Sequence, residues 1–264
     1  MRSALLVALL LTACAHVPAG PEALRATEVE VDGARVVVRH NAGEGEAAEQ
    51  VERVLPAAMR AAARWGRLPP DTVLTIHADA ASLASVAGSR ASPWMRGWAR
   101  RGAVDVQSPR TWSRGVASDE ALGQILAHEL THCVLFETAG AAWREQGIPH
   151  WFLEGMASVG AGERHRGARA EALGAPPELL ASDPRAVYAT ADRAFRDLLL
   201  QHGDLRVRRI LDGLAAGRPF PAAFRDATGW SLGDFEAGVA SRLQAVASRG
   251  LPAPDARGTA TQPR

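Results

Sequence analysis

A pair of histidines one helical turn apart, inside an apolar run, constrains this chain more than any other feature of its sequence. Residues 125–135 contain His128, Glu129 and His132 among leucine, isoleucine and valine side chains. An α-helix has 3.6 residues per turn, so the two histidines lie on one face, where their imidazoles can bind one metal ion. Glu129 directly follows His128 in the chain. From there its carboxylate can reach a water bound to that metal and act as a general base. The run therefore predicts a metal-binding helix.

A second segment offers a third ligand. Residues 148–158 predict another helix, with Pro149 in its first turn. Glu154 is an acidic residue in this otherwise apolar and aromatic segment, and a buried carboxylate needs a partner such as a metal ion. Catalytic zinc sites commonly have three protein ligands and leave a fourth position open, which fits this set. The pattern leaves an exposed Glu on an amphipathic helix as the alternative.

Together the two segments resemble the gluzincin zinc metallopeptidases, most closely the bacterial peptidase MA-like group. That group has the pattern HELTH followed by P-x-W-x-x-E-G-x-A, which residues 149–157 match, and Glu154 follows His132 by 22 residues. The resemblance implies that His128, His132 and Glu154 bind one zinc ion per chain. It further implies that Glu129 is the catalytic base of a peptidase. The resemblance is specific only in these two segments.

One position departs from the resembled pattern. Some gluzincins have an Asp four residues after the third ligand, where it orients a ligand histidine. The corresponding residue here is Ser158, a weaker and neutral acceptor. Asp119 and Glu137 are the other carboxylates that we consider for this role. His165 lies in a charged, glycine-punctuated stretch, and we expect it to be exposed.

Peptide hydrolysis also develops negative charge on the carbonyl oxygen, which a phenol or imidazole donor can stabilise. Tyr188 is the only tyrosine in the chain. Related families often draw such a donor from the region after the third ligand, so the resemblance makes Tyr188 a candidate catalytic residue. A tyrosine that only packs between helices is the alternative, and His150 and His202 are weaker candidates for the same role.

The N-terminal residues have the pattern of an export signal. Arg2 precedes an apolar run over residues 4–11, and residues 11–14 read Leu-Thr-Ala-Cys, which resembles a bacterial lipobox. We expect cleavage before Cys14, lipidation of Cys14, and a tether over residues 15–26. The protein would then be an exported lipoprotein, held at the periplasmic or cell-surface face of a membrane. An ordinary secretory signal that happens to contain a cysteine is the alternative.

The charges of the chain exclude one class of partner. Thirty basic residues balance 29 acidic ones, and nothing in the pattern indicates a nucleic-acid-binding surface. A local cluster of arginines is either a solvated face or a contact for substrate or anionic lipid; it comprises Arg96, Arg100, Arg101, Arg110 and Arg114. The second cysteine, Cys133, has no partner once Cys14 is acylated, so we expect it to serve packing.

The predicted fold class is α+β and zincin-like: a small mixed β-sheet, two zinc-ligand helices and a helical C-terminal lobe. We place the catalytic region at residues 27–174, the helical lobe at 175–248 and a disordered tail at 249–264. Within the catalytic region, Asp32-Gly33 predicts a hairpin turn. By the resemblance, Val104–Gln107 is a candidate edge strand that would bind the substrate backbone by strand addition. An edge strand that binds nothing is the alternative.

The sequence thus predicts a zinc-dependent peptidase that acts on envelope or extracellular proteins or peptides. A lipid-anchored, catalytically inactive zinc-binding or peptide-binding protein of the same fold is the first alternative. A structural envelope protein in which the motif is accidental is the second. Zinc content separates the second alternative from the other two, and the effect of Glu129→Gln on hydrolysis separates the peptidase from its inactive counterpart.

Overall fold

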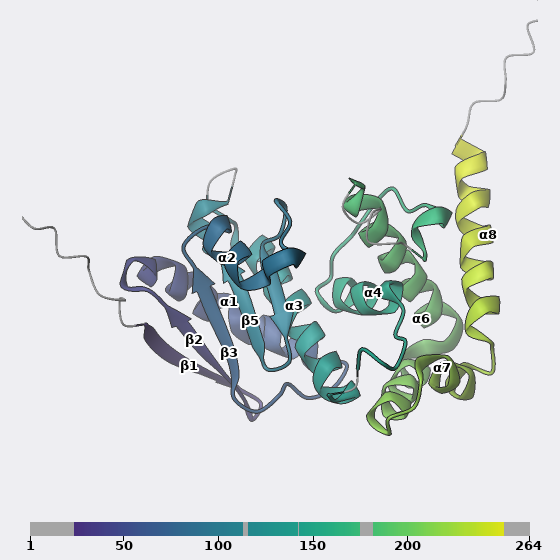
Figure 1. Cartoon of the computed structure of the whole chain (residues 1–264), viewed down its shortest axis with the longest axis horizontal. Coiled ribbons are helices and arrows are strands. Elements are labelled where there is room, and N and C mark those ends of the chain that lie inside the picture. The colour runs from purple at the N-terminus through teal and green to yellow at the C-terminus, as the bar shows by residue number, and fades with distance from the viewer. Residues whose placement is uncertain (1–23, 113–115, 142, 175–181, 251–264) are drawn as a thin grey trace, which may run out of the picture.

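Residues 24–112, 116–141, 143–174 and 182–250 are described by a computed structural model of the chain (Figure 1). The expected signal with Cys14 lies outside these ranges, as do almost all of the expected tether and tail. The helices in the described part of the chain all lack the combination of length and apolar character that is needed to cross a membrane.

Five strands form one mixed sheet in the N-terminal half, with the order β1-β2-β3-β5-β4. Its neighbours β2/β3 and β3/β5 are parallel, whereas β1/β2 and β4/β5 are antiparallel. The strands are β1 (Arg25–Val31), β2 (Ala34–His40), β3 (Thr72–His77), β4 (Gly97–Arg100) and β5 (Ala103–Gln107). The predicted hairpin joins β1 to β2, and Asp32 and Gly33 at its tip both have positive φ, as a tight two-residue turn requires.

The edge strand is not the one that the sequence predicted. Val104–Gln107 belongs to β5, which pairs with β3 on one side and β4 on the other and is therefore an interior strand. The edge strand beside β5 is β4, which turns into β5 through Arg101 and Gly102, where Gly102 has a φ of 69°. Because the chain forms this extra hairpin, β5 is an interior strand of the sheet and the four-residue β4 is the edge strand.

Three helices cover the sheet. Helices α1 (Gly45–Ala63) and α3 (Asp119–Ala139) pack together behind it, and α2 (Ala80–Ala87) lies in front (Figure 1). The face toward α1 and α3 is apolar because alternate strand residues point to it; fully buried members include Val36, Val38, Leu74, Val104 and Val106. This packing fixes α3, the predicted metal-binding helix, against the edge of the sheet.

The C-terminal half is helical, as predicted for residues 175–248. Its described α-helices are α4 (His150–Gly160), which we had placed in the catalytic region, α6 (Pro184–Ala215), α7 (Phe220–Thr228) and α8 (Leu232–Gly250). Helix α6 is two helices joined at Gly203, which has a φ of 73°. An aromatic core joins these helices, and its fully buried members are Trp151, Phe152, Phe195, Phe220, Phe224 and Phe235. In Figure 1, α3 and α4 lie where the two halves of the molecule meet.

A glycine sets the distance between α4 and α6. A Cβ added at Gly155 would overlap the carbonyl oxygen of Ala191 and lie 2.6 Å from the Cβ of Phe195. We expect Gly155→Ala to lower the free energy of unfolding by about 1 to 3 kcal/mol, the usual cost of overpacking a core. Urea unfolding followed by circular dichroism measures this. Gly45→Ala is the matched control, because a Cβ there has open space, and a destabilisation as large in the control would contradict the explanation.

Candidate metal centre

Helix α3 positions two histidines at the junction of the two halves. The helix is capped at its N-terminus by Ser118, whose hydroxyl accepts a hydrogen bond from the backbone N–H of Ala121 at 3.1 Å, and at its C-terminus by Gly140. Its middle turns are buried on all sides, and the exposed fractions of His128 and His132 are only 7% and 8%. The cost of burying two imidazoles indicates that they have partners there.

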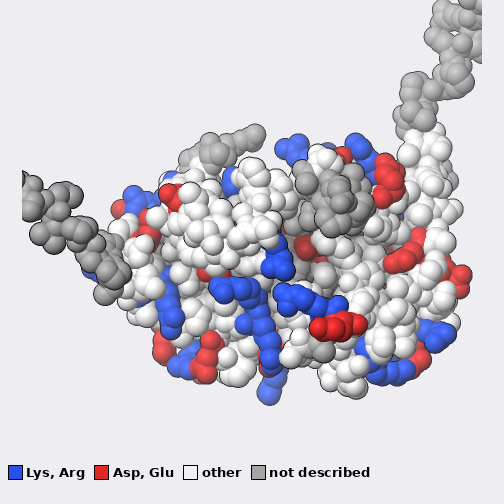
Figure 2. Space-filling view, in the orientation of Figure 1, with Lys and Arg blue, Asp and Glu red and all other residues white. Residues whose placement is uncertain are grey.

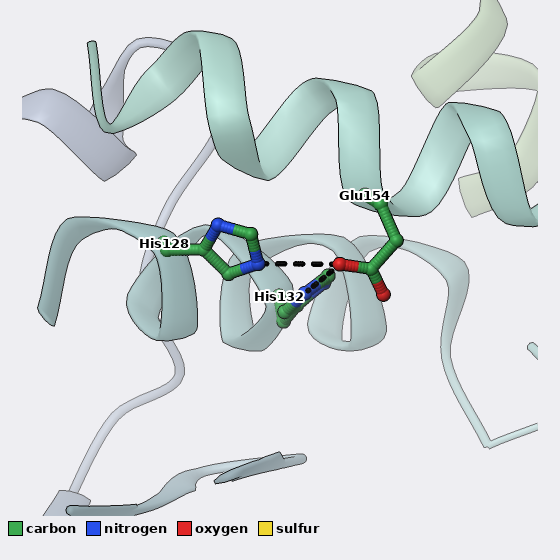
Figure 3. A group of neighbouring side chains, drawn as sticks. All are labelled: His128, His132 and Glu154. Atoms are coloured by element: carbon green, nitrogen blue, oxygen red, sulfur yellow. Dashed lines mark hydrogen bonds and ion pairs between the residues drawn. The ribbon is translucent and has the colours of Figure 1, made fainter. Parts of the chain in front are cut away.

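Helix α4 brings Glu154 to these histidines. Its Oε2 atom lies 3.2 Å from Nε2 of His128 and 3.5 Å from Nε2 of His132, and all three side chains point to one place (Figure 3). Their ligand atoms lie within 4.8 Å of one another. In a tetrahedral zinc site with bonds of about 2.0 to 2.1 Å, ligand atoms are about 3.3 Å apart. The donor set and its spacing therefore fit a zinc ion.

The charges of the site favour a cation between the helices. Burial acts to lower the pKa of His128, but the carboxylates of Glu154 and Glu163 outweigh it and raise that pKa well above its usual value. Burial acts to raise the pKa of Glu154, but His132 and His128 hold it well below its usual value. The carboxylate therefore stays ionised, and a bound metal ion can take the place of the imidazole proton.

Glu129 is buried beside the candidate ligands and is not one of them. Its exposed fraction is 9%, and its carboxylate makes no hydrogen bond to another described residue. Burial raises the pKa of its carboxyl group above the usual value. The side chain fits because Gly97 of β4 has no Cβ: an added Cβ would lie 2.6 Å from Cγ of Glu129. A buried carboxylate with a raised pKa has the properties of a general base.

Tyr188 of α6 lies beside the candidate ligand His128. Its ring centroid is 6.1 Å from that of His128, and its ring packs nearly perpendicular to that of Trp94, with ring centroids 5.6 Å apart. Burial and the carboxylates of Glu154, Glu129 and Glu163 raise the pKa of the phenol well above its usual value. The hydroxyl group therefore keeps its proton and remains a donor.

The two weaker candidates for this donor role are in different places. The Nε2 atom of His150 lies 3.7 Å from Oε1 of Glu154, on the more exposed side of the candidate ligands. His202 instead contacts Trp230, with ring centroids 5.8 Å apart. Of the three residues considered, Tyr188 and His150 are therefore the ones that the fold brings to the candidate ligands.

Sequence reasoning missed Glu163. Its Oε2 atom is 3.2 Å from Nδ1 of His128, on the side of the imidazole away from Glu154. Asp119 and Glu137, which we considered for this contact, bind arginines elsewhere: Asp119 pairs with Arg53 and Glu137 with Arg101, each at 2.8 Å. The only sequence signal was an acidic residue in the charged loop that directly follows α4.

His165 also differs from its prediction. We expected it to be exposed, but only 29% of its side chain is, and its Nε2 atom lies 2.9 Å from Oε2 of Glu163. Ser158 is fully buried, and its hydroxyl oxygen is 3.3 Å from the same Nε2 atom. Ser158 therefore contacts His165, whereas Glu163 contacts His128.

The arginine cluster is largely neutralised by local partners. Arg100 pairs with Asp105, Arg101 with Glu137, and Arg110 with Glu46. Arg96 donates to the backbone carbonyl groups of Pro93 and Met95, and Arg114 lies outside the described residues. Figure 2 shows basic side chains along the middle of one face, beside a hollow in which an acidic side chain is visible. Three of the four described members of the cluster thus have an acidic partner.

Cys133 packs in the core although it follows His132. Its thiol is fully buried and donates to the backbone carbonyl oxygen of Arg100 at 3.1 Å. Burial raises the pKa of the thiol to about 12. The thiolate that metal binding or disulfide exchange needs is therefore strongly disfavoured.

Comparisons with known proteins find likeness only in solved structures. No protein-family model matches the chain, and no curated protein matches it. A two-domain M1 zinc metallopeptidase variant bound to L-arginine is 15% identical, with a TM-score of 0.40 over 85% of this chain and 52% of that one. An M1 zinc metallopeptidase variant from Deinococcus radiodurans is 16% identical, with a TM-score of 0.42 over 88% and 54%. The chain thus spans about half the length of these two structures.

Proposed function

We propose that this protein is a zinc-dependent peptidase. The observation that supports this most directly is the meeting of Nε2 of His128, Nε2 of His132 and Oε2 of Glu154 at one buried point, with the Glu129 carboxylate beside it. Zinc, when bound, supplies a Lewis acid that lowers the pKa of a water toward neutrality and polarises the scissile carbonyl. His128, His132 and Glu154 would hold it.

The protein's own residues have distinct roles in the proposed reaction. Glu129 takes a proton from the attacking water and passes it to the leaving amine, for which its raised pKa is suited. Tyr188 donates a hydrogen bond to the carbonyl oxygen as negative charge develops there. The contact of its ring with His128 supports this placement.

Strand β4 is the proposed site for the substrate backbone. The N–H of Gln107 donates to the carbonyl oxygen of Arg96 at 2.9 Å, and hydrogen-bonded pairs alternate along an antiparallel ladder. The backbone groups of Gly97 and Ala99 therefore point away from β5, and they have no partner among the described residues. A peptide that pairs with this free edge would pass close to Glu129, against which Gly97 packs.

The place of action that we propose follows from the N-terminal pattern. Lipidation at Cys14 would anchor the enzyme to a membrane and direct it to envelope or extracellular proteins and peptides. Globomycin, which blocks the signal peptidase for lipoproteins, tests this in a bacterial host. We expect it to leave the signal uncleaved, and processing that continues unchanged would contradict the lipobox assignment.

Metal analysis of the full chain tests the proposed metal centre. We expect about one zinc per chain after purification in mild detergent without added metal, and its loss in His128→Ala and Glu154→Ala, because each removes one of three ligands. Zinc that stays bound without Glu154 would mean that the third ligand is misassigned. A parent chain that stays free of zinc even when zinc is supplied would refute the metal centre.

A further inference from the structure

We propose that Glu163 is the positioning residue that orients His128 for metal binding, an inference that rests on the proposed zinc site. The Nδ1–H group of His128 donates to Oε2 of Glu163 at 3.2 Å, and only 13% of the Glu163 side chain is exposed. A neutral imidazole that carries its proton on Nδ1 has its lone pair on Nε2. That nitrogen is the one that faces Glu154. Glu163 thereby selects the tautomer that can bind the ion.

Glu163 takes this role from a loop and not from the ligand helix itself. The position on α4 where the resembled pattern has a carboxylate is Ser158, whose hydroxyl group contacts His165. Directly after α4 the chain folds back, and the N–H of Glu163 donates to the carbonyl oxygen of Ser158 at 2.9 Å. This turn delivers the Glu163 carboxylate to the outer side of His128.

Two contacts hold Glu163 in that position, and a third holds one of its partners. The Nε2–H group of His165 donates to the same Oε2 atom at 2.9 Å. Arg196 of α6 donates through Nη2 to the backbone carbonyl oxygen of Glu163 at 2.7 Å, and Asp192, one turn earlier on α6, accepts from Nε of Arg196 at 2.8 Å. Both the backbone and the carboxylate of Glu163 are therefore fixed, as an orienting contact requires.

The two histidines differ in this respect. The Nδ1 atom of His132 is buried and has no hydrogen-bond partner among the described residues. Only His128 is thus oriented by a carboxylate. Loss of Glu163 should therefore loosen one of the three ligands and leave the other two in place.

The affinity of the full chain for zinc, measured by competition with a chromophoric chelator, tests this role. Removing an orienting carboxylate commonly costs about 10-fold to 100-fold in metal affinity, and we expect a loss in that range for Glu163→Ala. Glu163→Gln keeps the size and an acceptor oxygen, so we expect a loss between that of Glu163→Ala and none. Glu171→Gln, an exposed residue of the same loop, is the control and should bind zinc like the parent.

The Nδ1–H group of His128 gives a second readout, which a merely structural role would not change. Nitrogen-15 NMR of the zinc-loaded chain should show a slowly exchanging proton on Nδ1 of His128 in the parent, and faster exchange of that proton with water in Glu163→Gln. Parent-like affinity and parent-like exchange of the Nδ1 proton in Glu163→Gln would overturn the proposal, even if Glu163→Ala does not fold. An affinity loss as large as that of His128→Ala would also overturn it, because Glu163 would then be a ligand. A parent chain without zinc would instead refute the proposed function.

Discussion

Replacing Glu129 with Gln is expected to abolish peptide hydrolysis while the zinc content stays at the level of the parent. Gln has nearly the same size and shape, so it fits the space beside Gly97, but its amide cannot take up the proton of the attacking water. General-base catalysis contributes about 10²- to 10⁴-fold to a rate. We therefore expect kcat to fall by about 10⁴-fold or more, to a level at which hydrolysis is no longer detected. Single-substrate kinetics on a peptide selected from a library, with metal analysis of the same samples, measure both quantities.

The matched control for this variant lies on the same helix. Glu137→Gln makes the same chemical change at the C-terminal end of α3, where the carboxylate pairs with Arg101 and not with the candidate ligands. It should leave kcat and zinc content unchanged. Unchanged hydrolysis by Glu129→Gln would refute the general-base role. A parent chain that binds zinc but cleaves no peptide in the library would favour the inactive zinc-binding alternative.

The candidate metal-binding group could be anticipated in part from the sequence because the spacing of its two histidines is local. His128 and His132 are four residues apart, so they lie on the same face of a helix in any fold that contains this helix. Glu154 stood out as an acidic residue in an apolar segment, but its assignment as the third ligand came from the resemblance to the gluzincin pattern, since an exposed Glu was the alternative. The structure brings the three side chains together.

The contact between Glu163 and His128 could not be read from the sequence for the opposite reason. Glu163 lies in a loop without any period, and its position depends on the turn after α4 and on Arg196, 33 residues later. Asp119 and Glu137 were equally plausible carboxylates, since no local rule says which loop or helix end folds back onto a ligand. Only the tertiary structure distinguishes them.

The edge of the sheet was mispredicted for a related reason. The alternating residues of β5 have the pattern of a strand with one buried face, but that pattern does not say which strands lie on its two sides. Strand β4 has four residues, and its sequence Gly-Trp-Ala-Arg has no strong strand signal. The order of strands is set by long-range pairing, so the candidate edge strand shifts from Val104–Gln107 to Gly97–Arg100.

Substitution of Gly97 by Ala is the second change for which we expect a large loss of activity. An added Cβ would lie 2.6 Å from Cγ, 2.7 Å from Oε1 and 2.9 Å from Cδ of Glu129, so the carboxylate must move. A displacement of about 1 Å at a reacting group can cost about 10²-fold in rate, and we expect kcat to fall by about that factor. Zinc content should not change, because the ligands are on α3 and α4, and thermal unfolding should remain cooperative.

The matched control for Gly97→Ala is Gly123→Ala on α3. The atom nearest to a Cβ added there is the Cβ of Val54 at 3.9 Å, which is an ordinary van der Waals contact. It should keep parent activity and gain about 0.5 to 1 kcal/mol of stability, since Ala favours a helix interior more than Gly does. If Gly97 acts only by leaving room for the Glu129 carboxylate, the two active-site changes cannot add. The double variant Gly97→Ala/Glu129→Gln should then be as slow as Glu129→Gln alone. A further loss in the double variant would contradict this explanation of Gly97, because Ala keeps the same backbone N–H and C=O groups for pairing with a peptide.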